Sequence, residues 1–128
     1  MKVFTSNFRK DAKNPRAIAI CRVVPPWWRK PVIQELAPAV SILNLQGADF
    51  ADAFARQLRA LDRAAVIAAL RDGDVLLCYE AAFTGCHRHQ VADWLKAGGV
   101  DVDELQGVWG KSRQYGGGLF GEEESGGL

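Results

Sequence analysis

Three short apolar runs, each bounded by residues that break regular structure, predict the strands of a sheet. Residues 3–6 form the first run. Residues 17–24 alternate in polarity and stop at Pro25-Pro26, which is typical of a second strand. Residues 75–77 are apolar throughout and end before Glu80. A run without polar positions indicates a strand that is covered on both faces of a parallel or mixed sheet.

Between and after these runs, helical spacing and capping residues predict three helices. The first starts at Asp49, and the second is capped by Asp62 and continues through Leu70. The third begins near Cys86, where Thr84 or Gly85 can cap it, and stops at Gly98-Gly99. The first helix carries its apolar residues at helical spacing: Phe50, Phe54, Leu58 and Leu61.

The alternation of strands and helices predicts a single three-layer α/β domain with a short mixed or parallel sheet flanked by helices. We place this domain at residues 1–109, with residues 100–105 as a last strand or a brief turn. Residues 110–128 contain seven glycines and an acidic run of three glutamates, with little periodic apolar pattern. They are predicted to form a flexible tail.

Length and composition fit one globular protein with a substantial core, since 48% of the 128 residues are hydrophobic. The first residues lack the apolar core of a signal peptide, and every apolar stretch is too short to span a bilayer. We therefore expect a cytoplasmic protein with no membrane partner; the oligomeric state stays open. Three cysteines are an odd number, which favours reduced thiols, although Cys78 and Cys86 can pair transiently.

Charge is unevenly distributed along the chain. Residues 1–34 contain eight cations and one acid, a net charge of +7, whereas the remainder carries −6. Such a run forms either a solvated face or a surface for phosphate or nucleic acid. Trp27 and Trp28 lie beside Arg29 and Lys30, an arrangement that stacked bases use. The two tryptophans act as a lid or as a packing plug, and we favour the plug.

Candidate chemistry is concentrated between Cys78 and Arg88. A strand ending in Cys78 and Glu80 leads into a helix that opens with Cys86, His87 and Arg88. Backbone amides of a helix start lower a thiol pKa and attract anions, and open α/β sheets place their ligands at such strand ends. We therefore predict Cys86 as the nucleophile, with Glu80 or His87 moving protons.

Each of these residues also has a purely structural interpretation. Cys86 can be a small residue at a tight joint between strand and helix. Glu80 can form an ion pair with Arg22 or Arg88. His87 falls on the apolar face of its helix together with Val91, Trp94 and Leu95, and is expected to be buried.

Two other kinds of site are less well supported by spacing. A phosphatase-type loop needs five residues between cysteine and arginine, and Cys86 with Arg88 does not meet that requirement. Cys21, Cys78, Cys86 and His87 are ligand types for a metal, but the chain contains no Cys-x-x-Cys or His-x-x-x-His pair. We expect neither a metal nor a cofactor.

The segments LLCYE and CHRHQVADWL, with AICRVVPPWW and ELAP upstream, resemble a family of bacterial, archaeal and phage proteins, domain-of-unknown-function family 488. The resemblance spans most of residues 1–107 and is tightest at Cys-Tyr-Glu followed by Cys-His-Arg. It implies a fold and a site but no reaction, because the activity of the family is not established. The positions shared by resemblance are Arg22, Pro26, Leu36, Pro38, Cys78, Glu80, Cys86, His87 and Arg88.

Two classes of function follow. The first is a small cysteine-dependent enzyme that acts on a phosphate-bearing, nucleotide or nucleic-acid-derived ligand through Cys86. The second is a non-catalytic module that binds a nucleotide or a nucleic-acid strand while the cysteines pack. Expected ligand contacts are Arg22, Arg88, Cys78, Trp27 and Trp28.

Overall fold

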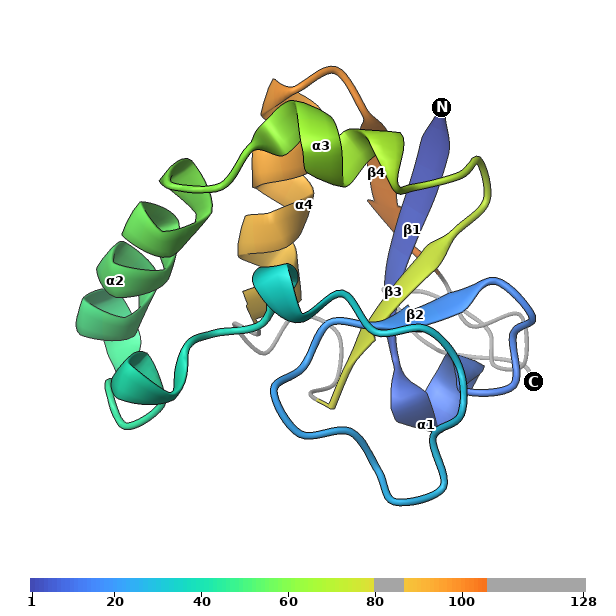
Figure 1. The fold of residues 1–128 in the computed structure, drawn as a ribbon, viewed down its shortest axis with the longest axis horizontal. Helices are drawn as coiled ribbons and strands as arrows, with labels where there is room; N and C mark the ends of the chain where they lie inside the picture. Colours follow the sequence, from blue (N-terminus) through green and yellow to red (C-terminus); the bar gives the residue numbers. More distant parts are fainter. Residues whose placement is uncertain (80–86, 106–128) are drawn as a thin grey trace, which may run out of the picture.

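The computed structural model describes residues 1–79 and 87–105, and its centre is one parallel sheet (Figure 1). Its strands are β1 (Lys2–Asn7), β2 (Ala17–Ala19), β3 (Val75–Cys78) and β4 (Asp101–Glu104), in the order β2-β3-β1-β4. Each neighbouring pair of strands is parallel. The predicted single small α/β domain is confirmed, with the sheet wholly parallel in the described residues.

The second strand is shorter than the apolar pattern predicted. It was expected to reach residue 24, but β2 ends at Ala19 and the chain bends at residues 21–23. The free edge of β2 is instead covered by the following segment, because Ile33 N donates to Ala19 O at 2.9 Å and Ala19 N donates to Pro31 O at 3.0 Å. The segment around Val32 therefore lies beside β2 and pairs with it through a parallel bridge to Ala19.

Helices α2 (Gly47–Arg59) and α3 (Arg63–Ala68) match the predicted pair, although α3 ends before Leu70. The Asp62 carboxylate accepts a hydrogen bond from Ala65 N at 3.1 Å, so the predicted cap is confirmed. Helix α4 is described from His87 to Ala97, and Gly99 follows it with φ +93°, a conformation that favours glycine.

Three shorter helices complete the described structure. Helix α1 (Phe8–Asp11) follows β1 directly, between the first two predicted strands. Two 3-10 turns, η1 (Gln34–Leu36) and η2 (Val40–Ile42), lead from β2 towards α2. Among the described residues, no helix is both long and apolar enough to cross a membrane.

The side chains of β3 alternate between two core clusters and so define three layers. Leu76 packs in the cluster formed with α2, α3 and α4, whereas Val75 and Leu77 pack in the cluster that contains Phe8 and Trp28. Figure 1 shows α4 and α1 well apart, at different sides of the sheet. One face of the sheet is therefore covered by α4, against which α2 packs, and the other by α1 with the Trp28 segment.

Candidate functional site

The candidate site lies where the central strands β1 and β3 end. Their last residues, Asn7 and Cys78, are opposite each other in the parallel register. The chain leaves β1 into α1 on one face, and β3 is followed by α4 on the other. In open α/β sheets, ligands bind outside the carboxyl ends of two neighbouring strands whose connections leave on opposite faces.

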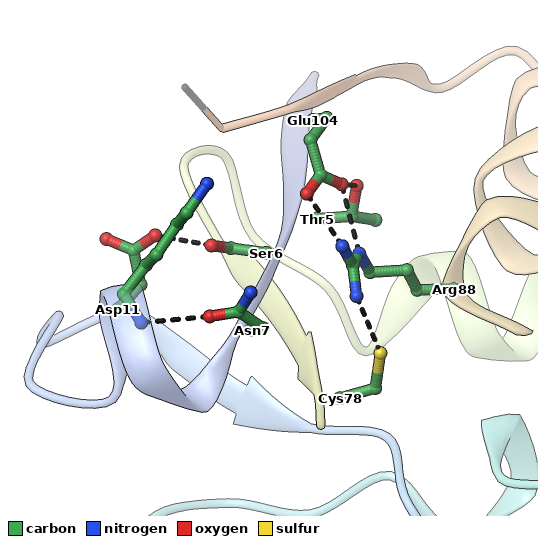
Figure 2. A network of polar contacts seen from close by, with 8 residues as sticks. Thr5, Ser6, Asn7, Asp11, Cys78, Arg88 and Glu104 are labelled. Atoms are coloured by element: carbon green, nitrogen blue, oxygen red, sulfur yellow. Dashed lines mark hydrogen bonds and ion pairs between the residues drawn. The ribbon is translucent and has the colours of Figure 1, made fainter. Parts of the chain in front are cut away.

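Arg88 is the centre of a buried polar network on the α4 side of β1 (Figure 2). Its side chain is fully buried, and its Nε and Nη2 donate to the two carboxylate oxygens of Glu104 at 3.1 and 3.0 Å. Its Nη1 donates to Cys78 Sγ at 2.9 Å, and Thr5 Oγ1 donates to Glu104 Oε1 at 2.7 Å. One guanidinium thus connects the start of α4 with the ends of β3 and β4.

A second polar network lies beside α1 (Figure 2). The Ser6 hydroxyl donates to the Asp11 carboxylate, and both side chains are buried. Asn7 Oδ1 accepts a hydrogen bond from Lys10 N at 2.9 Å and caps α1. Successive residues of a strand point to opposite faces, which is why Thr5 joins the Arg88 network and Ser6 joins this one.

The two described cysteines differ in state. Cys21 is buried, and its Sγ donates to Val23 O at 3.4 Å. Cys78 is buried, and its sulfur takes part in a disulfide. The expectation of reduced thiols throughout is therefore wrong for Cys78. Its sulfur still accepts the hydrogen bond from Arg88, because a disulfide sulfur keeps its lone pairs.

His87 is buried, as its place on the helical wheel predicted. Its Nε2 lies 2.7 Å from Ile20 O, and its ring meets Phe54 edge-on at 5.5 Å between centroids. Because a carbonyl oxygen only accepts, Nε2 carries the proton. His87 therefore ties the first turn of α4 to the end of β2, and its proposed part in proton transfer stays a prediction.

Arg22 and Arg88 are not brought together. The Arg22 guanidinium donates to Pro38 O at 3.0 Å, to Gln34 Oε1 at 2.6 Å and to Ala37 O at 3.3 Å. It stabilises the turns that follow β2 at one edge of the sheet, whereas Arg88 pairs with β4 at the other edge. These positions give the two cations separate structural tasks.

Trp27 and Trp28 have different environments. Trp28 is 6% exposed, its Nε1 donates to Pro31 O at 3.2 Å, and its ring meets Phe8 edge-on at 5.0 Å between centroids. The packing-plug interpretation is confirmed for Trp28. Trp27 is 58% exposed, although its ring centroid lies 6.4 Å from that of Phe8 and 6.1 Å from that of Trp28, so it does not act as a plug.

Two side chains near the site, His89 and Tyr79, have shifted pKa values. Partial burial, with the nearby Arg88 charge, lowers the pKa of His89 below its usual value. Loss of water contact, with the neighbouring Cys21, raises the pKa of Tyr79. Both groups are therefore held in their neutral forms over a wider range of pH than in an unfolded chain.

Two predicted catalytic residues, Glu80 and Cys86, lie outside the described residues, and so does the predicted tail at 110–128 with its boundary at residue 109. Their assignments stay predictions. Within the part of the chain that the structure describes, no group of three or more His, Cys, Asp or Glu side chains is arranged to hold a metal ion.

Several residues of the two polar networks were missed by sequence reasoning. The sequence contained a signal for Thr5, Ser6 and Asn7, because these three polar residues in succession end the first strand. Glu104 gave no local signal, since its partner lies sixteen positions away in α4. The residues missed are Thr5, Ser6, Asn7, Asp11 and Glu104.

Comparison with known proteins gave no relative: no family model, curated protein or solved structure matches this chain.

Proposed function

We propose that this chain binds a phosphate-bearing ligand, a nucleotide or a nucleic-acid-derived molecule, in the crevice between the ends of β1 and β3. We further propose that, in the reduced protein, it acts on this ligand through the thiol of Cys86. One observation carries the proposal: polar side chains from β1, β3 and α4 that are buried, with the largely buried Glu104 of β4, gather at the strand ends where the connections of β1 and β3 diverge. Burial of so many polar groups costs free energy that an apolar core would avoid.

Within this proposal, Arg88 is a positioning residue. Its guanidinium is occupied by Glu104 and Cys78, so it fixes the start of α4 against the strand ends. The first-turn amides of α4 then provide the partial positive charge that binds an anion and stabilises a thiolate. Glu80 and His87 are the candidate proton carriers, with Nε2 of His87 committed to Ile20.

A second candidate function is a non-catalytic module that binds the same class of ligand. The full burial of Arg88 and the disulfide at Cys78 favour it, because both features also suit residues that only stabilise the fold. In this alternative the crevice holds an anion, while Cys86 contributes packing and no chemistry.

Family membership and location belong to the same proposal. The resemblance to domain-of-unknown-function family 488 rests on the Cys-Tyr-Glu and Cys-His-Arg segments, and β3 with α4 carries the described parts of both. A cytoplasmic location agrees with a phosphate-bearing ligand.

The test is a crystal soak combined with a titration. Crystals soaked in phosphate should show an anion between the end of β1 and the start of α4. In solution, Arg88→Ala should weaken phosphate binding about tenfold, since a charge-assisted network worth roughly 1.5–3 kcal/mol that positions α4 is lost.

Arg71→Ala is the matched control, because this cation is exposed and lies outside the two networks. It should matter only slightly and mainly at low salt. An empty crevice, or equal weakening by both substitutions in variants that still unfold cooperatively, would reject the site. Phosphate binding with an unreactive Cys86 would leave the non-catalytic module.

A further inference from the structure

Four aromatic rings cluster just beyond the crevice, and two of them face solvent. Phe8 lies at their centre, with its ring centroid 5.0 Å from Trp28, 5.0 Å from Tyr79 and 6.4 Å from Trp27. Phe8 and Trp28 are buried, whereas Trp27 is 58% and Tyr79 is 52% exposed. The buried pair thus supports two exposed rings.

Side-chain hydrogen bonds hold this cluster in place. Tyr79 Oη donates to Val23 O at 2.9 Å, and Trp28 Nε1 donates to Pro31 O at 3.2 Å. Lys30 Nζ donates to Ala12 O at 2.8 Å, which ties the segment after α1 to the tryptophan segment. Exposed aromatic rings that are fixed before binding lose little entropy when a flat partner stacks on them.

Cations lie beside Trp27. A hollow of about 430 Å³ is lined by Ala12, Lys13 and residues 27–30, and a neighbouring hollow of about 620 Å³ is lined by residues 8–15. Lining cations that are exposed and form no salt bridge within the described residues are Arg9, Lys10, Lys13 and Arg29.

Opposite charge is scarce at this surface. Among the residues that line the two hollows, Asp11 is the sole acid, and its carboxylate is buried and accepts a hydrogen bond from Ser6. Among the described residues that line these hollows, cations therefore outnumber acids, and an anionic partner is favoured. We call Trp27, Tyr79 and the four exposed cations the aromatic-cationic surface.

The aromatic-cationic surface begins directly beyond the ends of β1 and β3, where the crevice is proposed. Phe8 and Tyr79 directly follow Asn7 and Cys78, the residues that face each other at the ends of β1 and β3. A chain-like ligand that places one phosphate in the crevice can therefore continue over Tyr79 and Trp27. A mononucleotide would leave this neighbouring surface unused.

We propose that the aromatic-cationic surface binds single-stranded nucleic acid, whose bases stack on Trp27 and Tyr79 while its phosphates meet the four cations. This inference rests on the proposed function and specifies its ligand class. Single strands fit better than a duplex, because stacking on protein rings requires bases that are not already stacked and paired. An anionic membrane is the competing partner, because its interface also accepts tryptophan and tyrosine rings, and binding to vesicles distinguishes the two.

The test uses two fluorescent 12-mers of equal charge, oligo(dT) and a strand that lacks bases. Fluorescence anisotropy should show tighter binding of oligo(dT) to the full chain. Trp27→Ala should weaken oligo(dT) binding about tenfold, the size expected for loss of one stacked base, and leave the abasic strand unchanged. Lys13→Gln should weaken binding of both strands and lower the salt dependence.

Matched controls separate stacking from general effects. Val40→Ala removes an exposed apolar residue elsewhere, and Arg71→Gln removes an exposed cation that lies outside both hollows. Neither should change oligo(dT) binding by more than about twofold. Trp27→Phe keeps a ring and should retain most of the affinity.

Three outcomes would overturn the inference: equal affinity of the two strands, tighter binding of a duplex, or preferential binding of anionic vesicles. If oligo(dT) fails to bind while phosphate still occupies the crevice, the proposed function stands and only this inference falls. If oligo(dT) binds through Trp27 while the crevice stays empty of phosphate, the surface is a separate strand-binding site and the crevice proposal fails.

Discussion

Arg88 and Glu104 form a two-point ion pair in which Nε and Nη2 of the guanidinium meet the two carboxylate oxygens at 3.1 and 3.0 Å. The arginine side chain is fully buried and the glutamate side chain is 11% exposed. Because β4 lies at the edge of the sheet and α4 covers it, this pair fixes the helix start in the direction along the strands. The proposed crevice at the strand ends depends on the position of the start of α4.

We predict that Arg88→Met lowers the free energy of unfolding by about 3–5 kcal/mol, because it leaves the Glu104 carboxylate buried without its partner. The double variant Arg88→Met/Glu104→Leu should recover a large part of the loss, since no unpaired charge remains. Urea unfolding measures both values. Arg71→Met, at an exposed site, is the control and should change stability by less than about 0.5 kcal/mol. A double variant as unstable as the single one would contradict this account.

Cys86 should have the lowest thiol pKa of the three cysteines, because it precedes the first turn of α4 and the Arg88 cation. Cys21 and Cys78 are buried in the sheet region, where an unpaired thiolate is unfavourable. The protein is first reduced, because Cys78 takes part in a disulfide. Iodoacetamide labelling at several pH values, followed by mass spectrometry, should then modify Cys86 fastest. Faster labelling of Cys21 or Cys78 in the folded protein would reject the assignment.

The sequence predicted the elements of this fold better than the details of its site. The short apolar run at residues 75–77 indicated a strand, and the capping residue Asp62 marked the start of α3. The partner of Arg88 was not predictable, because the pairing with Glu104 depends on β4 lying beside β1. The strand before Pro25-Pro26 was predicted too long, since Ile20 and Cys21 pack in the core after the strand has ended, whereas Val23 is exposed.

Removal of residues 110–128 should leave the midpoint of thermal unfolding almost unchanged. Glycine and glutamate in this segment bury too little apolar area to offset the entropy of ordering it. The described sheet is already complete at β4. Differential scanning calorimetry of the shortened chain tests this expectation. A fall of many degrees would show that the segment packs on the domain.

Acid should destabilise the protein in part through His89. Its pKa is lowered in the folded state by burial and by Arg88, so the unfolded chain binds a proton more readily. Stability is therefore lost as the pH falls below about 6.5, the value of an unperturbed histidine, and through the lower folded pKa. His89→Gln removes this contribution, and its melting temperature should fall less between pH 7.5 and pH 5 than that of the unchanged protein. An equal fall in both proteins would exclude His89 as a source.

Substitution of Asp11 tests the proposed anion site, because it should tighten phosphate binding. Its buried carboxylate lies beside the end of β1, bonded to Ser6, so it repels an anion bound there. Asp11→Asn removes the charge and keeps an oxygen that accepts the Ser6 hydrogen bond. Phosphate binding should therefore tighten by about five- to tenfold, the size of a partly screened charge interaction. Asp52→Asn, on the exposed side of α2, is the matched control and should leave binding unchanged. If Asp11→Asn weakens phosphate binding while the variant keeps its melting temperature, the carboxylate serves the ligand directly and the proposed anion does not bind beside it.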